Sequence, residues 1–397
     1  MRMKFRATLL ATALAAFPAV AHAEDVPVGI ILGFTGPAES VSGAQADAAE
    51  LAAKEVNASK LLLGGNTIVP KRGDGTCGDA SAATSVTERM VTSDKVVAIV
   101  GEGCSGATIA MVNNVAVPNG VVMISPSATS PALTDIKDDG YFFRTAPSDA
   151  RLGPVFAQIL MDRGFDEVAV TYSNSDYGRG MSDAFSTAYK GAGGKITISA
   201  PHDDGKADYS AEVATLAAAG GKLLVVFGYA DQGGLGVVKQ SLESGAFSKF
   251  AFGDGMYTDT VLKAVGKDIE GTIGAVPWAA GEGADAYAKI ASAAKLNPDD
   301  YAARESYDAM ALIALAMQKA GSTDRKALRD AMMEVANGPG EKILPGELAK
   351  GLQILKDGGD IDYVGATNVE FDKNGDVQGT YREYVIKDAQ YTTVQIR

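Results

Sequence analysis

Short apolar runs alternate with longer segments of helical periodicity along most of the chain. The apolar runs are typical of strands buried on both faces, as in a parallel sheet. The segments between them repeat their apolar positions every three or four residues, as amphipathic helices do. This alternation predicts an α/β fold of mostly parallel sheets flanked by helices. Strands are expected at residues 26–34, 96–100, 121–125, 167–172, 195–199, 222–229 and 250–255 and within 66–79; helices at 44–58, 81–93, 106–117, 150–163, 181–191, 210–219, 258–265, 301–320 and 324–336; and a closing hairpin at 369–386.

The unit at residues 95–134 suggests a binding site. A buried strand runs into a glycine-rich turn, and Ser105 follows where a helix N-cap is expected. The helix leads to a second buried strand, which is followed at once by Ser127 and Thr129. Ligands of open α/β sheets bind beyond the carboxyl ends of the strands, and helix N-termini there favour anions. The unit therefore predicts a site for a carboxylate or a phosphate.

The N-terminal segment has the pattern of a secretory signal. Three basic residues precede an apolar run that ends in Ala-His-Ala, which predicts cleavage after Ala23 and a mature chain that starts at Glu24. The run is too short to span a bilayer, and no later stretch reaches about 18 apolar residues. We therefore expect an exported, soluble protein of the periplasm.

Charge and cysteine content narrow the choice of partners. The formal charge of the full chain is −13, or about −16 without the three basic residues of the signal. Such acidity argues against nucleic acids and anionic membrane surfaces as partners. Cys77 and Cys104 are the only cysteines, and an oxidising compartment favours a disulfide between them over two unrelated buried thiols.

Three further motifs suggest other functions, but each lacks an essential part. Gly101–Gly106 has the spacing G-x-G-x-x-G, yet the next strand ends in Ser125 with no acidic residue for a ribose, so an NAD-dependent oxidoreductase is only a remote alternative. Residues 372–383 partly match a calcium loop, but Val377 replaces the glycine of its turn. His202 is the only histidine after the signal, too few for a typical zinc site or a catalytic triad. We expect no enzymatic activity, no metal and no cofactor.

Taken in order, the motifs resemble those of the periplasmic leucine/isoleucine/valine-binding proteins of ABC importers, which are type I periplasmic binding proteins. The similar segments are TGP after the first strand, the two cysteines, CSGAT, ISPSATSPALT, YFFRTAPSD, SDYGRGM, FGYADQGG, FGDG and FDKNGD. The resemblance covers most of the mature chain and implies two α/β lobes joined by three crossovers, with the ligand in the cleft between them. After a signal peptide of residues 1–23, it implies an N-terminal lobe of residues 24–146 and 278–381 and a C-terminal lobe of residues 147–277 and 382–397.

The resemblance also assigns roles to residues at the anion end of the site. Ser105 and Thr129 would bind the α-carboxylate of the ligand through hydroxyl and backbone groups. Ser127 would contribute through its backbone. All three positions match serine or threonine positions in the motifs CSGAT and SPSATS.

Other residues would complete the site. Tyr177 and Tyr229 would close over the ligand from the second lobe, and Asp254 would pair with the α-ammonium, where the family often has glutamate. Cys77 and Cys104 would form the disulfide of the family.

One position departs from the family pattern. Val41 stands where the loop after TGP usually brings an aromatic ring against the ligand side chain, which opens the specificity to larger side chains. The sequence thus predicts a monomeric receptor that captures a free amino acid, branched-chain or similar, and presents it to the membrane permease of an ABC transporter. The alternative is the same fold binding a carboxylic acid without an amine, such as an aromatic acid, or acting as a sensor. Asp254 argues against this alternative, because a buried carboxylate facing an apolar ligand is costly.

Overall fold

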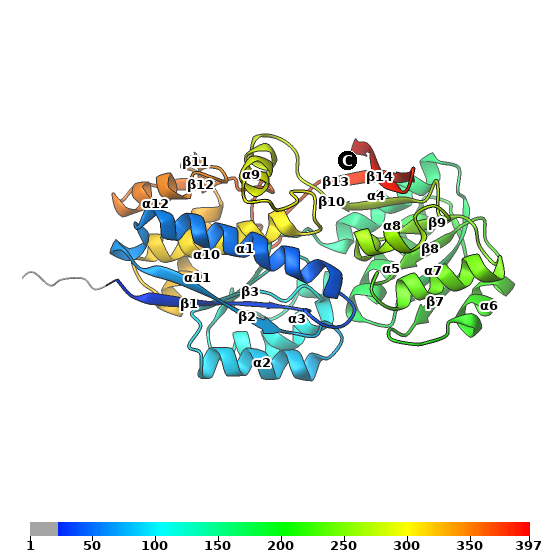
Figure 1. The fold of residues 1–397 in the computed structure, drawn as a ribbon, viewed down its shortest axis with the longest axis horizontal. Coiled ribbons are helices and arrows are strands. Elements are labelled where there is room, and N and C mark those ends of the chain that lie inside the picture. Colours follow the sequence, from blue (N-terminus) through cyan, green and yellow to red (C-terminus); the bar gives the residue numbers. More distant parts are fainter. Residues whose placement is uncertain (1–22) are drawn as a thin grey trace, which may run out of the picture.

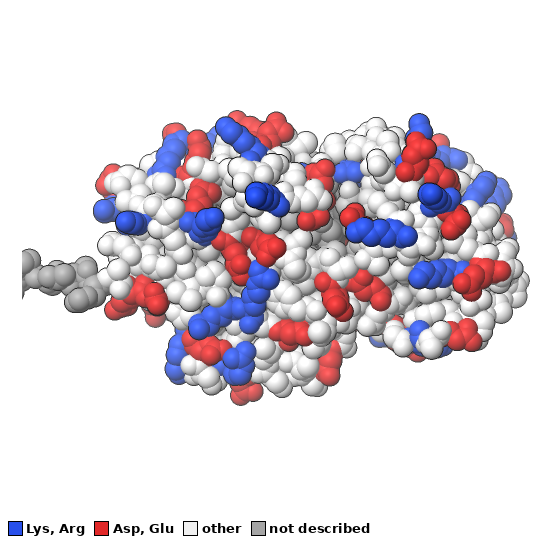
Figure 2. All heavy atoms as spheres, in the orientation of Figure 1, with Lys and Arg blue, Asp and Glu red and all other residues white. Residues whose placement is uncertain are grey.

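The computed structural model describes residues 23–397, which form two α/β lobes arranged along the long axis of the molecule (Figure 1). The expected signal peptide lies outside the described residues, except for Ala23 at its end. Within the described part of the chain, no helix combines the length and the apolar character that a membrane span requires. On the face shown in Figure 2, acidic and basic side chains are interspersed over both lobes.

The first lobe is built on a five-stranded parallel sheet of order β2-β1-β3-β4-β5. Successive residues of a strand face opposite sides of the sheet, so Ile30 packs in the core beneath α1 and α10 while Ile31 packs against α2 and α3 (Figure 1). The bounds are β1 Asp25–Leu32, α1 Glu39–Ser59, β2 Thr67–Asp74, α2 Ala80–Thr92, β3 Ala98–Gly101, α3 Ser105–Met111, β4 Val122–Ser125 and β5 Phe142–Arg144. A π-helical segment, η2 Val112–Ala116, continues α3.

Later parts of the chain complete this first lobe. Helix α10 (Ala303–Ala320) is buried from Ala303 to Gln318, and its second half, Ala309–Met317, is an uninterrupted run of small and apolar residues. It packs against α1 and α11 and contacts α12 as well. The remaining elements here are α9 Glu282–Ala293, α11 Arg325–Ala336, β11 Glu341–Ile343, α12 Leu348–Lys356 and β12 Ile361–Tyr363.

The second lobe contains a seven-stranded sheet of order β14-β13-β10-β9-β8-β6-β7. The pairs among β6, β7, β8, β9 and β10 are parallel. At the other edge of the sheet, β13 pairs antiparallel with both β10 and β14. The bounds are α4 Asp149–Asp162, β6 Glu167–Ser173, α5 Asp176–Gly191, β7 Lys195–His202, α6 Ser210–Ala219, β8 Leu224–Phe227, α7 Gly233–Ser244, β9 Phe250–Phe252, α8 Asp259–Val265, β10 Ile273–Pro277, β13 Tyr381–Lys387 and β14 Gln390–Ile396. The chain therefore passes between the two sheets after β5, after β10 and before β13.

The expected closing hairpin at residues 369–386 is wrong. Phe371 and Val377 form only an isolated bridge around Asn374-Gly375, because the carbonyl of Gly375 accepts a hydrogen bond from Arg144 N at the edge of the first sheet. The hairpin that closes the chain is β13–β14, whose turn has positive φ angles at Asp388 and Ala389. A two-residue turn with positive φ normally uses Asn, Asp or Gly, and Ala389 is none of these, so the pair carries a weaker turn signal than Asn374-Gly375.

Candidate functional site

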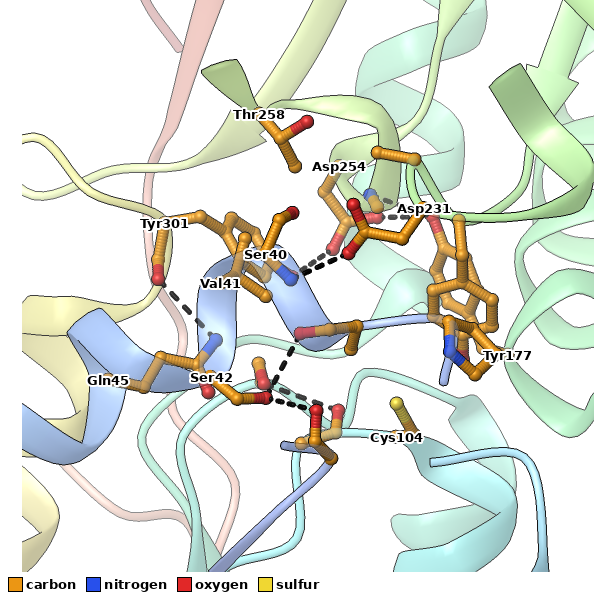
Figure 3. A pocket seen from close by; sticks show the side chains of 18 of the residues that line it. Ser40, Val41, Ser42, Gln45, Cys104, Tyr177, Asp231, Asp254, Thr258 and Tyr301 are labelled. Carbon is orange, nitrogen blue, oxygen red and sulfur yellow. Dashed lines mark hydrogen bonds between the residues drawn. The ribbon is translucent and has the colours of Figure 1, made fainter. Parts of the chain in front are cut away.

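A pocket with about 520 Å³ between its lining atoms lies between the two lobes and is partly open to solvent (Figure 3). The first lobe contributes the start of α1, including Val41, and the start of α3. The second lobe contributes Tyr177 at the start of α5, which follows β6, and the segments that follow β8 and β9. Tyr301, from the loop before α10, closes one side (Figure 3). The pocket is therefore formed at the carboxyl ends of strands from two different sheets.

Asp254 is the one strongly polar group at the centre of the second-lobe wall. It begins a 3₁₀ turn, η4 (Asp254–Met256), directly after β9, and only 1% of its surface is exposed. Its carboxylate accepts hydrogen bonds from the hydroxyls of Tyr177 at 2.6 Å and Tyr301 at 2.8 Å (Figure 3). Within residues 23–397 no lysine, arginine or histidine pairs with it. Burial raises the pKa of Asp254, while the two tyrosine hydroxyls oppose that shift. A cation that enters the pocket would supply the missing charge.

The two predicted tyrosines lie together beside this carboxylate. Their ring centroids are 5.1 Å apart, with the rings of Tyr177 and Tyr229 tilted against each other. Burial raises the pKa of both hydroxyls well above the ordinary value, so both groups remain proton donors at neutral pH. Both residues line the pocket.

Ser105 and Ser127 line the opposite wall of the pocket. The sequence had placed Ser105 at the N-cap of this helix. In the structure Cys104 is the N-cap residue of α3, and Ser105 is the first residue of the helix itself. The hydroxyl oxygen of Ser105 accepts a hydrogen bond from Ser130 N at 3.1 Å, which leaves the hydroxyl proton available to an acceptor in the pocket. The hydroxyl of Ser127 donates to Gly103 O at 3.2 Å. This wall thus offers the Ser105 hydroxyl beside the backbone N–H groups at the start of α3. These groups are uncharged hydrogen-bond donors, and such donors at a helix start can bind an anion.

Thr129 does not line the pocket. It is 1% exposed, and its hydroxyl donates to the Oδ2 atom of Asp149 at 2.9 Å. Asp149 is the first residue of α4, and its backbone N–H donates to Thr129 O at 2.8 Å. The other carboxylate oxygen of Asp149 has no hydrogen-bond partner, and burial raises the pKa of this group well above its ordinary value. Thr129 thus connects the two lobes behind the pocket.

Cys77 and Cys104 form a disulfide, as expected from the compartment and from the family resemblance. Cys104 belongs to the pocket wall and directly precedes Ser105. The bridge therefore fixes the start of α3 to the loop that follows β2. Behind it lies Glu102, fully buried, whose pKa burial raises to about 8.

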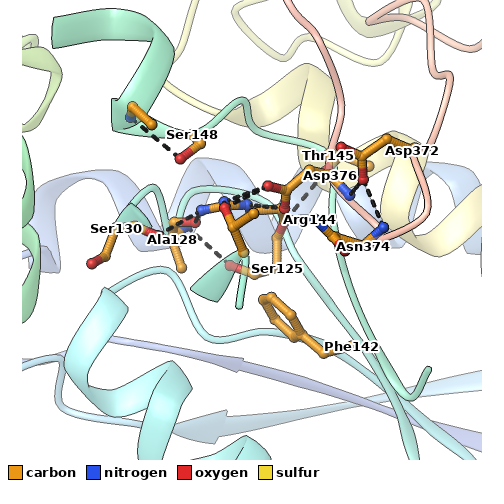
Figure 4. Close-up of polar contacts among 12 residues, drawn as sticks. Ser125, Ala128, Ser130, Phe142, Arg144, Thr145, Ser148, Asp372, Asn374 and Asp376 are labelled. Atoms are coloured by element: carbon orange, nitrogen blue, oxygen red, sulfur yellow. Dashed lines mark hydrogen bonds and ion pairs between the residues drawn. The ribbon is translucent and has the colours of Figure 1, made fainter. Parts of the chain in front are cut away.

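A buried ion pair holds the serine-bearing loop in place (Figure 4). Arg144, 0% exposed, donates through Nε and Nη2 to the two carboxylate oxygens of Asp376 at 2.6 and 2.8 Å. Its Nη1 donates to the carbonyls of Ala128 and Ser130 at 3.1 and 3.0 Å. Arg144 thereby ties the loop around Ser127 to the late segment that carries Asp376.

The segment that partly matches a calcium loop uses its acidic residues in other contacts. The Oδ1 atom of Asp372 accepts hydrogen bonds from the backbone N–H groups of Asn374 and Asp376, while the Asp376 carboxylate binds Arg144 (Figure 4). In the part of the chain that the structure describes, no group of three or more His, Cys, Asp or Glu side chains is arranged to hold a metal ion. Asp372 thus stabilises a turn, and Asp376 forms an ion pair with Arg144.

Ser40, Asp231 and Tyr301 are among the pocket residues that sequence reasoning missed. Asp231 follows Tyr229 closely in the FGYADQGG segment, so its position after a strand was a usable signal. Ser40 contributes a backbone N–H, which no side-chain pattern reveals. Tyr301 reaches the pocket from the loop before α10, far from the other site residues in sequence.

Comparisons with known proteins find similar sequences and structures. A family model described as "Periplasmic binding protein" matches residues 25–343. The "Leu/Ile/Val-binding protein homolog 1" of Brucella melitensis is 32% identical over 327 residues, which is 81% of this chain and 85% of that protein.

Two solved structures show the same fold. A branched-chain amino acid transporter substrate-binding protein of Streptococcus pneumoniae, in complex with isoleucine, has a TM-score of 0.77 and 23% identity, covering 94% of this chain and 98% of that chain. A solute-binding protein of an ABC transporter from R. palustris, in complex with benzoate, has a TM-score of 0.76 and 18% identity, covering 94% and 96%. Proteins of this fold therefore accept ligands both with and without an amine.

Proposed function

Because this chain belongs to the periplasmic binding protein family, we propose that it captures a free amino acid, branched-chain or similar, in the pocket between its lobes and delivers it to the permease of an ABC transporter. Members of the family bind their substrates without transforming them, and the family implies an exported, periplasmic protein. In this proposal the signal is cleaved after Ala23 and the mature protein acts as a monomer.

The observation that carries the choice of an amino acid is the unpaired carboxylate of Asp254. Two tyrosine hydroxyls hold it in place, yet they leave its charge uncompensated in a buried setting. An α-ammonium between Asp254 and the pocket centre would remove that cost. The α-carboxylate would then lie against Ser105 and Ser127 on the opposite wall. Thr129 would contribute indirectly in this arrangement, by holding the lobes together behind the ligand.

The apolar part of the ligand would lie near the start of α1. Val41, Pro37 and Ala230 line the pocket together with Cys104, so an aliphatic side chain would be buried among carbon atoms. Among residues 23–397, no lysine or arginine lines the pocket, and the two charged lining residues, Asp231 and Asp254, are both acidic. An acidic side chain would therefore be rejected.

A second candidate function is the binding of a carboxylic acid that lacks an amine. The benzoate complex of a protein with the same fold favours it. Against it stands the same buried carboxylate, because a ligand without a positive charge would leave Asp254 unpaired and facing another anion. The two candidates thus differ in the sign of the effect expected from removing the charge of Asp254.

The variant Asp254→Asn separates these functions. We expect leucine, isoleucine or valine to raise the melting temperature of the wild type, since a ligand bound only by the folded state stabilises it. Asp254→Asn should weaken amino-acid binding by about 2–5 kcal/mol in calorimetric titrations, because it leaves a buried ammonium without a counter-charge. Binding of the matching 2-oxo acid or of benzoate should fall much less or improve.

Asp268→Asn is a matched control, because it makes the same charge change at an exposed position of the same lobe. Its binding should equal that of the wild type. An Asp254→Asn protein that binds the amino acids as well as the wild type does would contradict the proposed role, and selective binding of benzoate by the wild type would favour the second candidate.

A further inference from the structure

Helix α1 begins without a cap of its own. Its N-cap residue is Ala38, which has no side-chain acceptor for the first N–H groups of the helix. Glu39 N donates to Gly36 O, and Val41 N donates to Ala38 O, both within the same loop. The N–H of Ser40 has its acceptor elsewhere: it donates to the Oδ2 atom of Asp231 at 2.7 Å (Figure 3).

Asp231 belongs to the opposite lobe. It lies in the loop between β8 and α7, 191 residues further along the chain than Ser40. This loop also carries Tyr229, and Ala230 N donates to Gly255 O next to Asp254, so Asp231 is fixed to the ligand-facing wall. The Asp231 side chain is half-buried, and within residues 23–397 no lysine, arginine or histidine pairs with it. Its one described hydrogen bond crosses the pocket.

We propose that Asp231 caps helix α1 across the cleft and thereby latches the two lobes over the bound ligand. A carboxylate at a helix start satisfies a free N–H and meets the positive end of the helix dipole. Helix α1 has 21 residues, long enough for that dipole to act. Because donor and acceptor lie on different lobes, this cap exists only while the lobes are closed. The contact therefore favours the closed state. This inference rests on the proposed function, because closure of the lobes is what retains the ligand.

The latch affects the dissociation rate of the ligand more than its association rate. Interactions formed only after closure slow dissociation and leave the encounter of ligand and open protein nearly unchanged. Replacing an aspartate cap by alanine weakens a cap by an amount that corresponds to about 2- to 30-fold in an equilibrium constant, whereas asparagine caps almost as well as aspartate. Asp231 is thus a positioning residue, and its oxygen matters more than its charge.

The test compares Asp231→Ala with Asp231→Asn, using L-leucine as the probe. Stopped-flow measurements should show that Asp231→Ala releases leucine about 2- to 30-fold faster, with a similar association rate, and that Asp231→Asn recovers most of the wild-type release rate. Glu243→Gln, an exposed carboxylate of α7 in the same lobe, is the matched control and should release leucine at the wild-type rate.

Hydrogen exchange of the Ser40 amide reports the contact itself. With leucine bound and the lobes closed, the amide should exchange faster in Asp231→Ala than in the wild type, while the amides in the middle of α1 keep their protection. Equal release rates and equal Ser40 exchange in the wild type and Asp231→Ala would overturn the latch. A wild type that binds no amino acid would instead overturn the proposed function, and the exchange of the Ser40 amide would then be compared between the two proteins with benzoate bound, which decides the latch separately.

Discussion

The buried ion pair between Arg144 and Asp376 provides a quantitative test of what holds the first lobe together. Asp376→Ala removes both carboxylate oxygens, which leaves the Arg144 guanidinium, 0% exposed, with only carbonyl and hydroxyl partners. Breaking a buried pair on one side costs about 3–5 kcal/mol, because the remaining charge stays away from water. Since a domain is stable by only about 5–15 kcal/mol, much of the stability of the lobe would be lost.

Urea unfolding at pH 7, followed by circular dichroism, measures this loss as a lower midpoint. Asp360→Asn is the matched control: it removes the same charge from a pair with Lys319 in which the aspartate side chain is 67% exposed. Exposed pairs contribute at most about 1 kcal/mol, so the control midpoint should hardly move. The double variant Arg144→Met/Asp376→Leu should lose less stability than Asp376→Ala alone, because it leaves no unpaired charge. Equal midpoints for Asp376→Ala and Asp360→Asn would refute the reasoning.

Two further predictions concern the region behind the pocket wall. Burial raises the pKa of Glu102 from 4.5 to about 8, so the folded state keeps a proton that the unfolded chain releases, and stability should fall as the pH rises from about 4.5 to 8. Glu102→Gln should flatten that slope in urea titrations; an unchanged slope would assign it to another group. Replacing Cys77 and Cys104 by serine should reduce the free energy of unfolding by about 3–4 kcal/mol, and an unchanged midpoint would show that the disulfide adds nothing.

Most of the fold was accessible from the sequence because buried strands and amphipathic helices leave a local pattern. Helix α6 lies at the expected residues 210–219, β4 ends at Ser125 as expected, and β3 ends at Gly101, one residue beyond the expected end. Helices α9 and α12 and strands β11 and β12 were not predicted. They are short elements at the outside of the first lobe, and β11 and β12 have three residues each, too few to establish a period.

The presence of a residue at the pocket was predictable only where its position just after a strand brings it there. Ser105, Ser127 and Asp254 follow strands directly, so the sheet topology brings them to the pocket. Thr129 lies two residues beyond Ser127 in an irregular loop, and its side chain turns toward Asp149 instead. A local pattern does not fix side-chain direction in such a loop. Tyr301 depends on how a distant segment packs, which only the assembled lobes determine.

The placement of α10 has a consequence for the order in which the protein is made. This helix forms the buried centre of the first lobe against α1, although their starts, Glu39 and Ala303, lie 264 residues apart. During synthesis, the apolar face of α1 and the strands beneath it therefore cannot complete their core until residues 303–320 have been made. Contacts so distant in sequence slow folding and leave apolar surface exposed meanwhile. The first lobe would thus remain incompletely folded until residues 303–320 are made, and that part of the chain could still be threaded through a narrow channel.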